Sequence, residues 1–419
     1  MSVNDGKNWQ KLQGNFPVVP VYEMKIKQDD LVVGTHGRSF WILDDLTPLR
    51  ELAGQSSGTE TEISGIRFFP PRTTYRRTLN WSVNLFLGDG KNYSPDFGLP
   101  GTHYQETTTD GEKRFRHLDM GENPPEGVIV NYFIESEANL TPEKPLELIV
   151  LDANGAEIER FSTKKTDEKS DKSESEPSDE KSSLTAKVGF NRFVWNMHYP
   201  GPEVKIDKSL EEAGYKPLGR GEAGPGGGPI APPGSYQVCL KSGENEIRHS
   251  FEIVKDPRLN TSPEDFSAQF ELWIKIRNRV SDVNSAINRI RRIKLQITEL
   301  LARENFNNSA EEKSFGEIQK AAEALRENFN TLENELTQNQ YETPSDRLRH
   351  PTMLKQRMEA LVSVVAVADA APPQQAYSVF EHLSALIDQR LAELSELEEQ
   401  EVVRLNQQID QAGIRKLQG

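Results

Sequence analysis

The hydrophobic pattern of this chain changes its period near residue 260. Before that point, short runs alternate apolar and polar residues and end at Gly, Asn, Asp or Pro, as β-strands do. From Thr261 onward, apolar residues recur every three or four positions, which is typical of amphipathic helices. A chain of 419 residues with both patterns in separate parts is expected to be a multidomain α+β protein.

The helical part opens with Ser262 and Pro263, an N-cap followed by proline at the first helical position. Four amphipathic segments follow; the second starts with a capping box at 309–312, and the fourth comes after a Pro-Pro step. Their connections are short, so we expect an antiparallel four-helix bundle over residues 257–419. The narrow apolar stripes favour helix packing, with self-association of the bundle through its first and fourth helices as the alternative.

Residues 121–256 predict an immunoglobulin-like β-sandwich, with Trp195 as its core aromatic residue. Two insertions interrupt it. Residues 164–183 are nearly all Lys, Glu, Asp and Ser and are expected to be disordered, whereas 219–233 form a Gly/Pro-rich loop. That loop contains the spacing of a dinucleotide-binding fingerprint but lacks the strand and helix that the fingerprint requires. The strands are expected at 128–134, 146–152, 156–161, 190–198, 235–241 and 247–254.

Residues 51–120 are expected to be a linker and an irregular, aromatic-rich segment. Two prolines within 68–72 indicate an extended linker, and residues 75–104 are broken repeatedly by Gly and Pro. We therefore expect one strand followed by a packed loop. Its aromatic residues Trp81, Tyr93 and Tyr104 are expected to fill a domain interface, with stacking on sugar rings as the alternative.

Residues 30–45 predict a β-hairpin whose two strands are apolar without alternation, as in a strand covered on both faces. His36 and Arg38 lie in its turn and Trp41 follows in the second strand. In one interpretation these residues bind a ligand, because the forked donors of Arg38 suit an anionic or sugar-like group. In the other, the polar side chains bond buried carbonyls or pair with the two aspartates that end the hairpin.

The first residues place Ser2, Asn4, Gly6 and Trp9 at offsets 0, 2, 4 and 7. Ser and Asx side chains can bond a turn backbone, glycine permits positive φ, and an indole can cover the turn. This spacing resembles the Asp-box of bacterial neuraminidase-type (BNR) repeats, with Asn4 in place of aspartate and Asn8 in place of threonine. The resemblance assigns these residues a structural role.

With the hairpin, the Asp-box turn resembles the last blade region of bacterial sortilin-like BNR-repeat "glycosyl hydrolase" proteins. The resemblance extends through the strand at 191–199, the strand start at 233–236, residues 256–258 and the closing helices. It implies a partial β-propeller blade over residues 1–50 and an extracytoplasmic location; the chain itself indicates no compartment. A propeller has four to eight blades, so the resemblance is to the C-terminal part of a longer protein.

Composition argues against several classes of function. A net charge of −15, with no basic stripe, argues against nucleic-acid binding, and no run of about 20 apolar residues predicts a membrane span. The single cysteine, Cys239, excludes an internal disulfide, and no two of the seven histidines have the i, i+4 spacing of a helical metal site. We predict no catalytic residue, no metal and no cofactor.

These features predict a non-catalytic interaction and support region that docks on a propeller domain of a longer chain or of a partner. Two alternatives remain open. The chain is part of a glycoside hydrolase whose active site lies in upstream blades, or it is a peptide- or carbohydrate-binding module that uses His36, Arg38 and Trp41.

Overall fold

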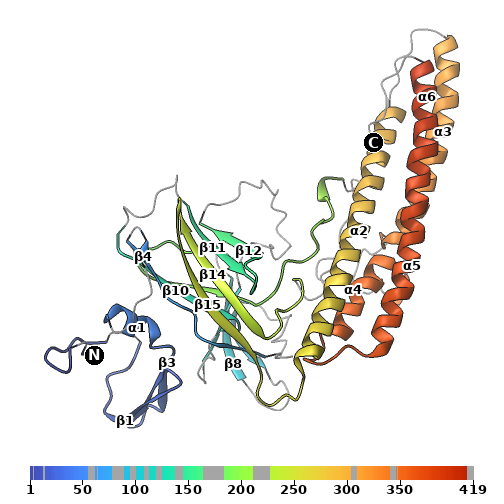
Figure 1. Ribbon diagram of the computed structural model, residues 1–419. Coiled ribbons are helices and arrows are strands. Elements are labelled where there is room, and N and C mark those ends of the chain that lie inside the picture. Colours follow the sequence, from blue (N-terminus) through green and yellow to red (C-terminus); the bar gives the residue numbers. More distant parts are fainter. Residues whose placement is uncertain are drawn as a thin grey trace. The chain divides into compact units, whose positions relative to one another are not determined.

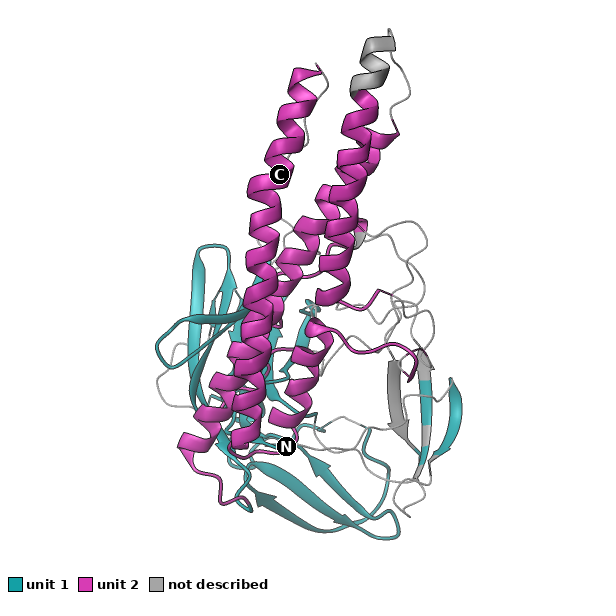
Figure 2. Cartoon of the chain, turned by 90° about the vertical axis from the view of Figure 1, so that its right-hand side faces the viewer, with its two compact units in different colours: residues 1–197, 233–258 teal, residues 198–232, 259–419 magenta. Residues whose placement is uncertain are grey.

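The structure is a computed structural model in which the mixed α+β chain divides into two compact units (Figures 1 and 2). Unit 1 comprises Met1–Met197 and Pro233–Arg258, and unit 2 comprises His198–Pro232 and Leu259–Gly419. The structure describes residues 1–2, 4–12, 15–54, 62–63, 65–77, 89–94, 101–107, 113–118, 125–136, 145–163, 184–210, 227–302, 309–339, 346 and 348–412.

Within its described residues, unit 1 forms four β-sheets and one short helix. The sheets have the strand orders β1-β2-β3, β13-β10-β5-β4, β12-β11-β14-β15-β6 and β7-β8-β9. All neighbouring strands are antiparallel except β6, which lies parallel to β15. The elements are β1 (Val21–Lys27), β2 (Asp30–Thr35), β3 (Phe40–Leu43), α1 (Thr47–Leu52), β4 (Glu62–Ile63), β5 (Ile66–Phe68), β6 (Thr74–Arg76), β7 (Gly90–Ser94), β8 (Gly101–Thr107), β9 (Lys113–His117), β10 (Val128–Ile134), β11 (Leu146–Leu151), β12 (Glu157–Ser162), β13 (Gly189–Trp195), β14 (Gly234–Ser242) and β15 (Asn245–Lys255).

Aromatic side chains from the two larger sheets meet in a shared core. Trp195 on β13 lies 6.1 Å from Tyr236 on β14 and 6.4 Å from Phe251 on β15, measured between ring centroids. The rings of Phe161 and Phe193 lie 4.5 Å apart across the same core. Trp195 is 1 % exposed, so the prediction that it is the core aromatic residue is confirmed.

The expectation of a linker and irregular loop over residues 51–120 is wrong where the structure describes that segment. β5 pairs with β10 and with β4, and β6 pairs with β15, so this segment adds two strands to one of the larger sheets and one strand to the other. Residues that were expected in a loop instead form β7 and β8, which join β9 in a third sheet. β5 and β6 are three residues long and their partners β10 and β15 lie far away in the sequence, so local pattern does not reveal them. β7, β8 and β9 pair with their neighbours in the sequence, and the Gly and Pro residues around them are what pointed to a loop.

Several other predictions fall outside the described residues. They concern the disordered insertion at 164–183, the first part of the Gly/Pro-rich loop at 219–226, the aromatic residue Trp81, and the side chains of the second capping box at 309–312.

Unit 2 contains long helices at the positions that their apolar periodicity predicts. Ser262 caps the first of them: its side chain accepts from the Asp265 N–H, and the Asp265 carboxylate accepts from the Ser262 N–H. A large apolar core joins the helices, with Ile276, Phe329 and Ile387 fully buried in it. The elements are η3 (Lys208–Leu210), α2 (Pro263–Leu301), α3 (Ser309–Leu336), α4 (Leu354–Val365), α5 (Gln374–Glu396), the π-helical turn η5 (Leu397–Val402) and α6 (Val403–Gln411).

The extended segment that follows β13 belongs to the helical unit. The Asn284 side-chain amide on α2 donates to the Val204 carbonyl at 2.8 Å, and Asn288 donates to the Lys205 carbonyl at 2.8 Å. The Asp207 N–H donates back to the Asn288 side chain at 2.8 Å. Asparagine side chains on α2 thus satisfy the backbone of an extended segment that has no sheet partner at these positions.

A buried charge cluster lies within the helical core. Glu333 on α3 accepts from Arg291 at 2.7 Å and from Lys294 at 2.9 Å, both on α2. Burial alone would raise the pKa of Glu333, but the attraction of Lys294 and Arg291 outweighs it, and the pKa is lowered. Glu333 therefore stays ionised and links α3 to α2.

We expect Glu333→Gln to lower the free energy of unfolding by about 3–5 kcal/mol at pH 7, because it leaves two buried cations without their carboxylate. The folded-state pKa of Glu333 is lowered, so its contribution is present above pH 4.5 and is lost as the pH falls through that pKa. The difference in the free energy of unfolding between the variant and the wild type should therefore become smaller below pH 4.5. Urea unfolding at several pH values measures it, and Glu323→Gln, at an exposed position on α3, should change little.

We expect Trp195→Ala to destabilise unit 1 by about 3–5 kcal/mol, because it leaves a cavity between the two larger sheets. Trp9→Ala is the matched control, since Trp9 is 75 % exposed and its loss should change stability by less than about 0.5 kcal/mol. Circular dichroism during thermal unfolding measures the melting temperature of each variant. Equal melting temperatures would contradict the assignment of Trp195 to the core.

Candidate functional site

The N-terminal turn is braced by its own side chains. The Ser2 hydroxyl accepts from the Gly6 N–H at 2.9 Å, and the Asn4 side chain accepts from the Asn8 N–H at 2.9 Å. Gly6 has a φ of +80°, and the Trp9 indole lies beside it, 3.8 Å from where a β-carbon would stand. The four residues of the Asp-box resemblance thus form one compact turn in which each has a structural part.

The predicted hairpin over residues 30–45 is confirmed, and a further strand extends it. β2 pairs with β3 through Val33 and Trp41, and β1 pairs with the other edge of β2 through Met24 and Val33. We call β1, β2 and β3 together the N-terminal sheet, drawn in blue in Figure 1. β1, in which apolar and charged residues alternate, lies outside the hairpin predicted over residues 30–45.

The three predicted ligand residues, which lie in the turn of this hairpin and in β3, differ in their solvent exposure and contacts. His36 and Arg38 are exposed, and the His36 ring stacks on Tyr22 with centroids 5.2 Å apart. Trp41 is half-buried: its indole N–H donates to the Arg38 carbonyl at 3.0 Å, and its ring meets Phe16 edge-on at 5.5 Å. Trp41 therefore holds the turn in shape, while the two polar side chains face solvent. Within the described part of the chain, Arg38 forms no ion pair with Asp44 or Asp45, so that alternative is wrong for Arg38.

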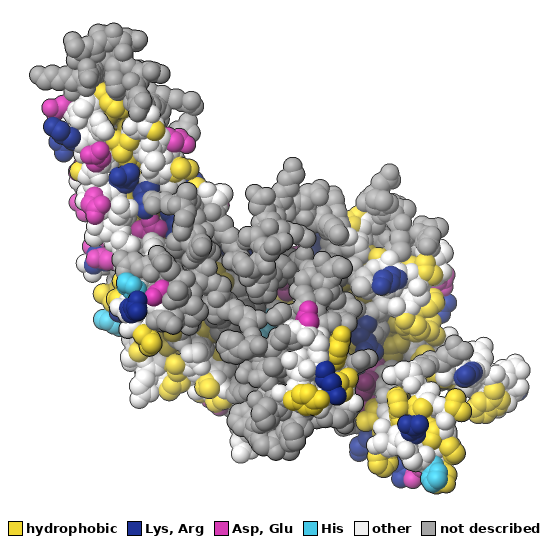
Figure 3. Space-filling view, turned by 180° about the vertical axis from the view of Figure 1, so that it is seen from behind, with side chains coloured by type: hydrophobic (Ala, Val, Ile, Leu, Met, Phe, Trp, Pro, Cys, Tyr) yellow, Lys and Arg dark blue, Asp and Glu magenta, His cyan; other side chains and the backbone are white. Residues whose placement is uncertain are grey.

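Apolar side chains are exposed on both faces of the N-terminal sheet. Residues directly opposite one another in an antiparallel sheet share a face, so the register places Met24, Ile26 and Leu43 on one face and Phe40 and Ile42 on the other. Their exposed fractions range from 40 % for Leu43 to 77 % for Phe40. Figure 3 shows yellow side chains on the surface of this N-terminal part, at lower right. The expected cover is only partial: Val33 is buried and Phe16 packs on the Trp41 ring, while the face of Phe40 and Ile42 also carries Glu23, Lys25 and Lys27 of β1.

The N-terminal sheet is fastened to the rest of unit 1 by Asp30. One oxygen of its carboxylate accepts from the Asp45 N–H at 2.8 Å and from Arg72 at 2.7 Å. Arg50 on α1 forms a second ion pair with Asp29. Polar contacts at one end of the sheet therefore help to fix it to the rest of unit 1.

Two aspartates at the end of β3 have different roles. Asp45 accepts from the Thr47 N–H at 3.1 Å and so supports the start of α1, as expected of a turn-capping residue. Burial, together with repulsion from Asp30, raises the pKa of Asp44. The Asp45 charge also contributes to the raised pKa of Asp44, and the Asp45 carboxylate is engaged by the Thr47 N–H.

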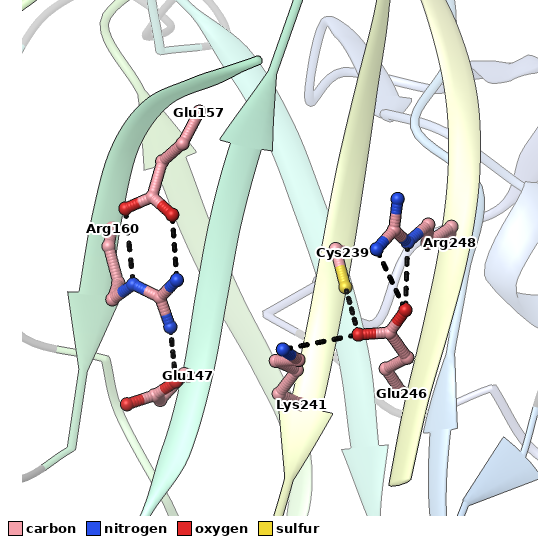
Figure 4. A network of polar contacts seen from close by, with 7 residues as sticks. All are labelled: Glu147, Glu157, Arg160, Cys239, Lys241, Glu246 and Arg248. Atoms are coloured by element: carbon pink, nitrogen blue, oxygen red, sulfur yellow. Dashed lines mark hydrogen bonds and ion pairs between the residues drawn. The ribbon is translucent and has the colours of Figure 1, made fainter. Parts of the chain in front are cut away.

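A charged network covers the outer face of the sheet that contains β14 (Figure 4). Glu246 accepts from Arg248 at 3.0 Å and pairs with Lys241 at 3.3 Å, and the Cys239 thiol donates to it at 3.7 Å. Burial and then the Glu246 charge raise the pKa of Cys239, so the thiol stays protonated at neutral pH. On this outer face, Cys239 is buried beside Ile149. The arrangement suits a structural cysteine and gives no activated nucleophile.

An open cavity of about 310 Å³ lies beside the turn between β1 and β2 and is lined by Tyr75, Arg77 and Arg258. Arg258 forms a bidentate pair with Asp256 and lowers the pKa of that carboxyl to about 2. This ion pair stabilises the chain directly after β15. Because Asp256 neutralises Arg258, neither group is assigned a catalytic role. In the described part of the chain, no three His, Cys, Asp or Glu side chains gather as a metal site requires.

Comparison with protein-family models, curated proteins and solved structures finds no match to this chain. The likeness to sortilin-like BNR-repeat proteins therefore rests on the sequence motifs and stays a prediction. None of the helices in the described ranges has an apolar stretch that would span a bilayer.

We expect Arg72→Ala to loosen the N-terminal sheet by about 1 kcal/mol, because the Asp30 carboxylate loses a charged donor. Hydrogen exchange in peptides that cover residues 30–45 should then quicken about fivefold, while exchange in β10 and β14 should not change. Arg67→Ala is the control, since Arg67 pairs with Glu62 and Glu135 away from this sheet. Equal exchange in both variants would show that Asp30 does not anchor the sheet.

Proposed function

We propose that this chain is a non-catalytic interaction and support region that docks on a propeller domain, of a longer chain or of a partner, through its N-terminal sheet. One observation carries the proposal: this small sheet is attached firmly at one end while apolar side chains on both its faces meet solvent. Isolated exposed apolar residues are ordinary on protein surfaces, but a contiguous group of them marks an interaction site.

The Asp-box turn supports the same proposal. Its side chains bond their own backbone, so Ser2 and Asn4 are occupied in holding the turn. Such a turn at the end of a small antiparallel sheet fits one blade of a propeller of the sortilin-like BNR-repeat type. A blade of this kind needs neighbouring blades to bury its faces.

The rest of the chain then serves as support. We infer that the two larger sheets form an immunoglobulin-like sandwich, because their inner faces meet through aromatic rings such as Trp195 and Phe161. We infer that α2, α3, α4 and the continuous α5–η5–α6 helix form an antiparallel four-helix bundle, because one apolar core joins them all. Both inferences describe supporting domains, and neither requires a catalytic group.

The test replaces apolar side chains on the docking element and follows the size of the complex. In extracts of the source cells, the wild-type chain should elute well above its own mass of 47.3 kDa in size-exclusion chromatography. The double variant Phe40→Thr, Ile42→Thr should shift to the free chain, with at least a tenfold loss of the complex.

The matched control carries two equally conservative changes on helices, Leu295→Thr and Val403→Thr, at positions that are each 47 % exposed. It should keep the wild-type elution. A wild-type chain that elutes at its own mass, or a control that shifts like the variant, contradicts the proposed function.

A further inference from the structure

We propose that His249 on β15 is a pH-sensitive switch within unit 1, and that its protonation in mild acid loosens β5 and α1 and with them the attachment of the N-terminal sheet. The inference concerns how this sheet is held to the rest of unit 1. It therefore goes beyond the proposed function and does not depend on what the sheet docks on.

The His249 side chain lies between the two larger sheets. It alternates with outward-facing residues along β15, on the same inner face as Phe251, and it is 6 % exposed. Its Nε2 atom lies 3.0 Å from the Phe68 carbonyl oxygen on β5, and the imidazole and the Phe68 ring have centroids 5.0 Å apart. A single histidine thus joins β15 to β5, two strands that belong to different sheets.

The contact with Phe68 defines the protonation state of the His249 ring. A carbonyl oxygen only accepts hydrogen bonds, so Nε2 carries the hydrogen and Nδ1 is the atom that binds an added proton. An imidazolium buried between two sheets costs free energy, because its charge leaves water. Burial accordingly lowers the pKa of His249, and the Phe68 carbonyl and the Glu51 charge offset this effect only in part. The intact contact therefore belongs to the neutral imidazole.

The groups around His249 offer little compensation for an added charge. Within the described ranges, the half-buried Glu51 on α1 is the carboxylate that acts on the imidazole. The phenols of Tyr132 on β10 and Tyr236 on β14, on the same inner faces, do not ionise in acid. Arg67 on β5 is already paired with two glutamates, and the charged residues of β15 itself alternate to the outer face. Protonation therefore favours conformations in which β5 or α1 moves and the ring reaches water.

Both polar attachments of the N-terminal sheet come from elements next to His249. Arg72, which binds Asp30, follows β5 closely in the chain. Arg50, which binds Asp29, lies on α1. Movement of β5 or α1 away from a protonated His249 displaces these arginines from their aspartates. The N-terminal sheet is then held less firmly at the end where it is attached.

Asp44 lies at the same attachment and responds to acid in the opposite sense. Its pKa is raised, first by burial and then by repulsion from Asp30, so its protonation stabilises the attachment as the pH falls. The folded-state pKa of His249 lies below 6.5, so its stabilising contribution is complete above pH 6.5 and decreases as the pH falls below that value. Loosening in mild acid therefore points to His249 and not to Asp44.

Hydrogen exchange of the full chain at pH 7 and pH 5.5, corrected for the intrinsic effect of pH on exchange, tests the switch. Three proteins are compared: the wild type, His249→Gln and His382→Gln. Glutamine at position 249 can still donate to the Phe68 carbonyl but does not titrate in this range. His382 is exposed on α5, so its replacement is the matched control.

From pH 7 to pH 5.5, exchange in wild-type peptides that cover residues 30–45 and 65–72 should quicken by about three- to eightfold. The upper value, about eightfold, applies if the imidazole has its ordinary pKa of 6.5 in the open form and stays neutral in the closed form. His382→Gln should show the same increase, and His249→Gln should show none. An equal increase in His249→Gln, or no increase in the wild type, would overturn the inference.

A second measurement on the wild type covers the case in which His249→Gln does not fold. Nuclear magnetic resonance follows the His249 ring as the pH is lowered. The ring should become protonated below pH 6.5, over the same range in which residues 30–45 and 65–72 begin to exchange faster. Protonation of the ring at pH 6.5 or above, or without faster exchange, would overturn the switch. Neither result alters the complex expected at neutral pH, so the proposed function is tested separately.

Discussion

Burial of aromatic side chains between the two larger sheets is the constraint on which the rest of unit 1 depends. Trp195, Tyr236 and Phe251 come from β13, β14 and β15, and their contacts require both sheets at once. The short strands β5 and β6 then complete the sheets, although each is three residues long. Such strands are stable because they are added to an existing core. The Arg72 that follows β5 is thereby placed where it can bind Asp30.

In the two larger sheets, buried apolar side chains hold the strands in place, whereas the N-terminal sheet is held by polar contacts. Polar contacts at Asp29 and Asp30 hold it, while its apolar side chains, Phe40 and Ile42 among them, face solvent. In the core of unit 1, apolar surface is buried and charged groups are paired on the outer face of the sheet, as in the network around Glu246. A sheet that departs from both patterns is explained most simply if further protein covers it.

Electrostatics in this chain serves structure. Glu333 joins two helices through buried cations, Asp256 braces a reversal through Arg258, and Cys239 is kept protonated by its surroundings. The Cys239 thiol, Glu246 and Arg248 have shifted pKa values in one network between β14 and β15, and the contacts that shift them hold these two strands together.

The sequence by itself determined the elements whose signals are local. The helices after Ser262, the strands around Trp195, the Asp-box turn at Ser2 and the hairpin of residues 30–45 follow from period, capping and turn chemistry. The tertiary structure decided which short segments became strands, as with β5 and β6, because their hydrogen-bond partners on β10 and β15 lie far away in the sequence. It also decided exposure: the apolar residues of β3 predict a covered strand, but whether a face is covered depends on what else packs against it. Exposure therefore depends on contacts that are distant in the sequence. The N-terminal sheet is the candidate site because the structure leaves its apolar side chains exposed.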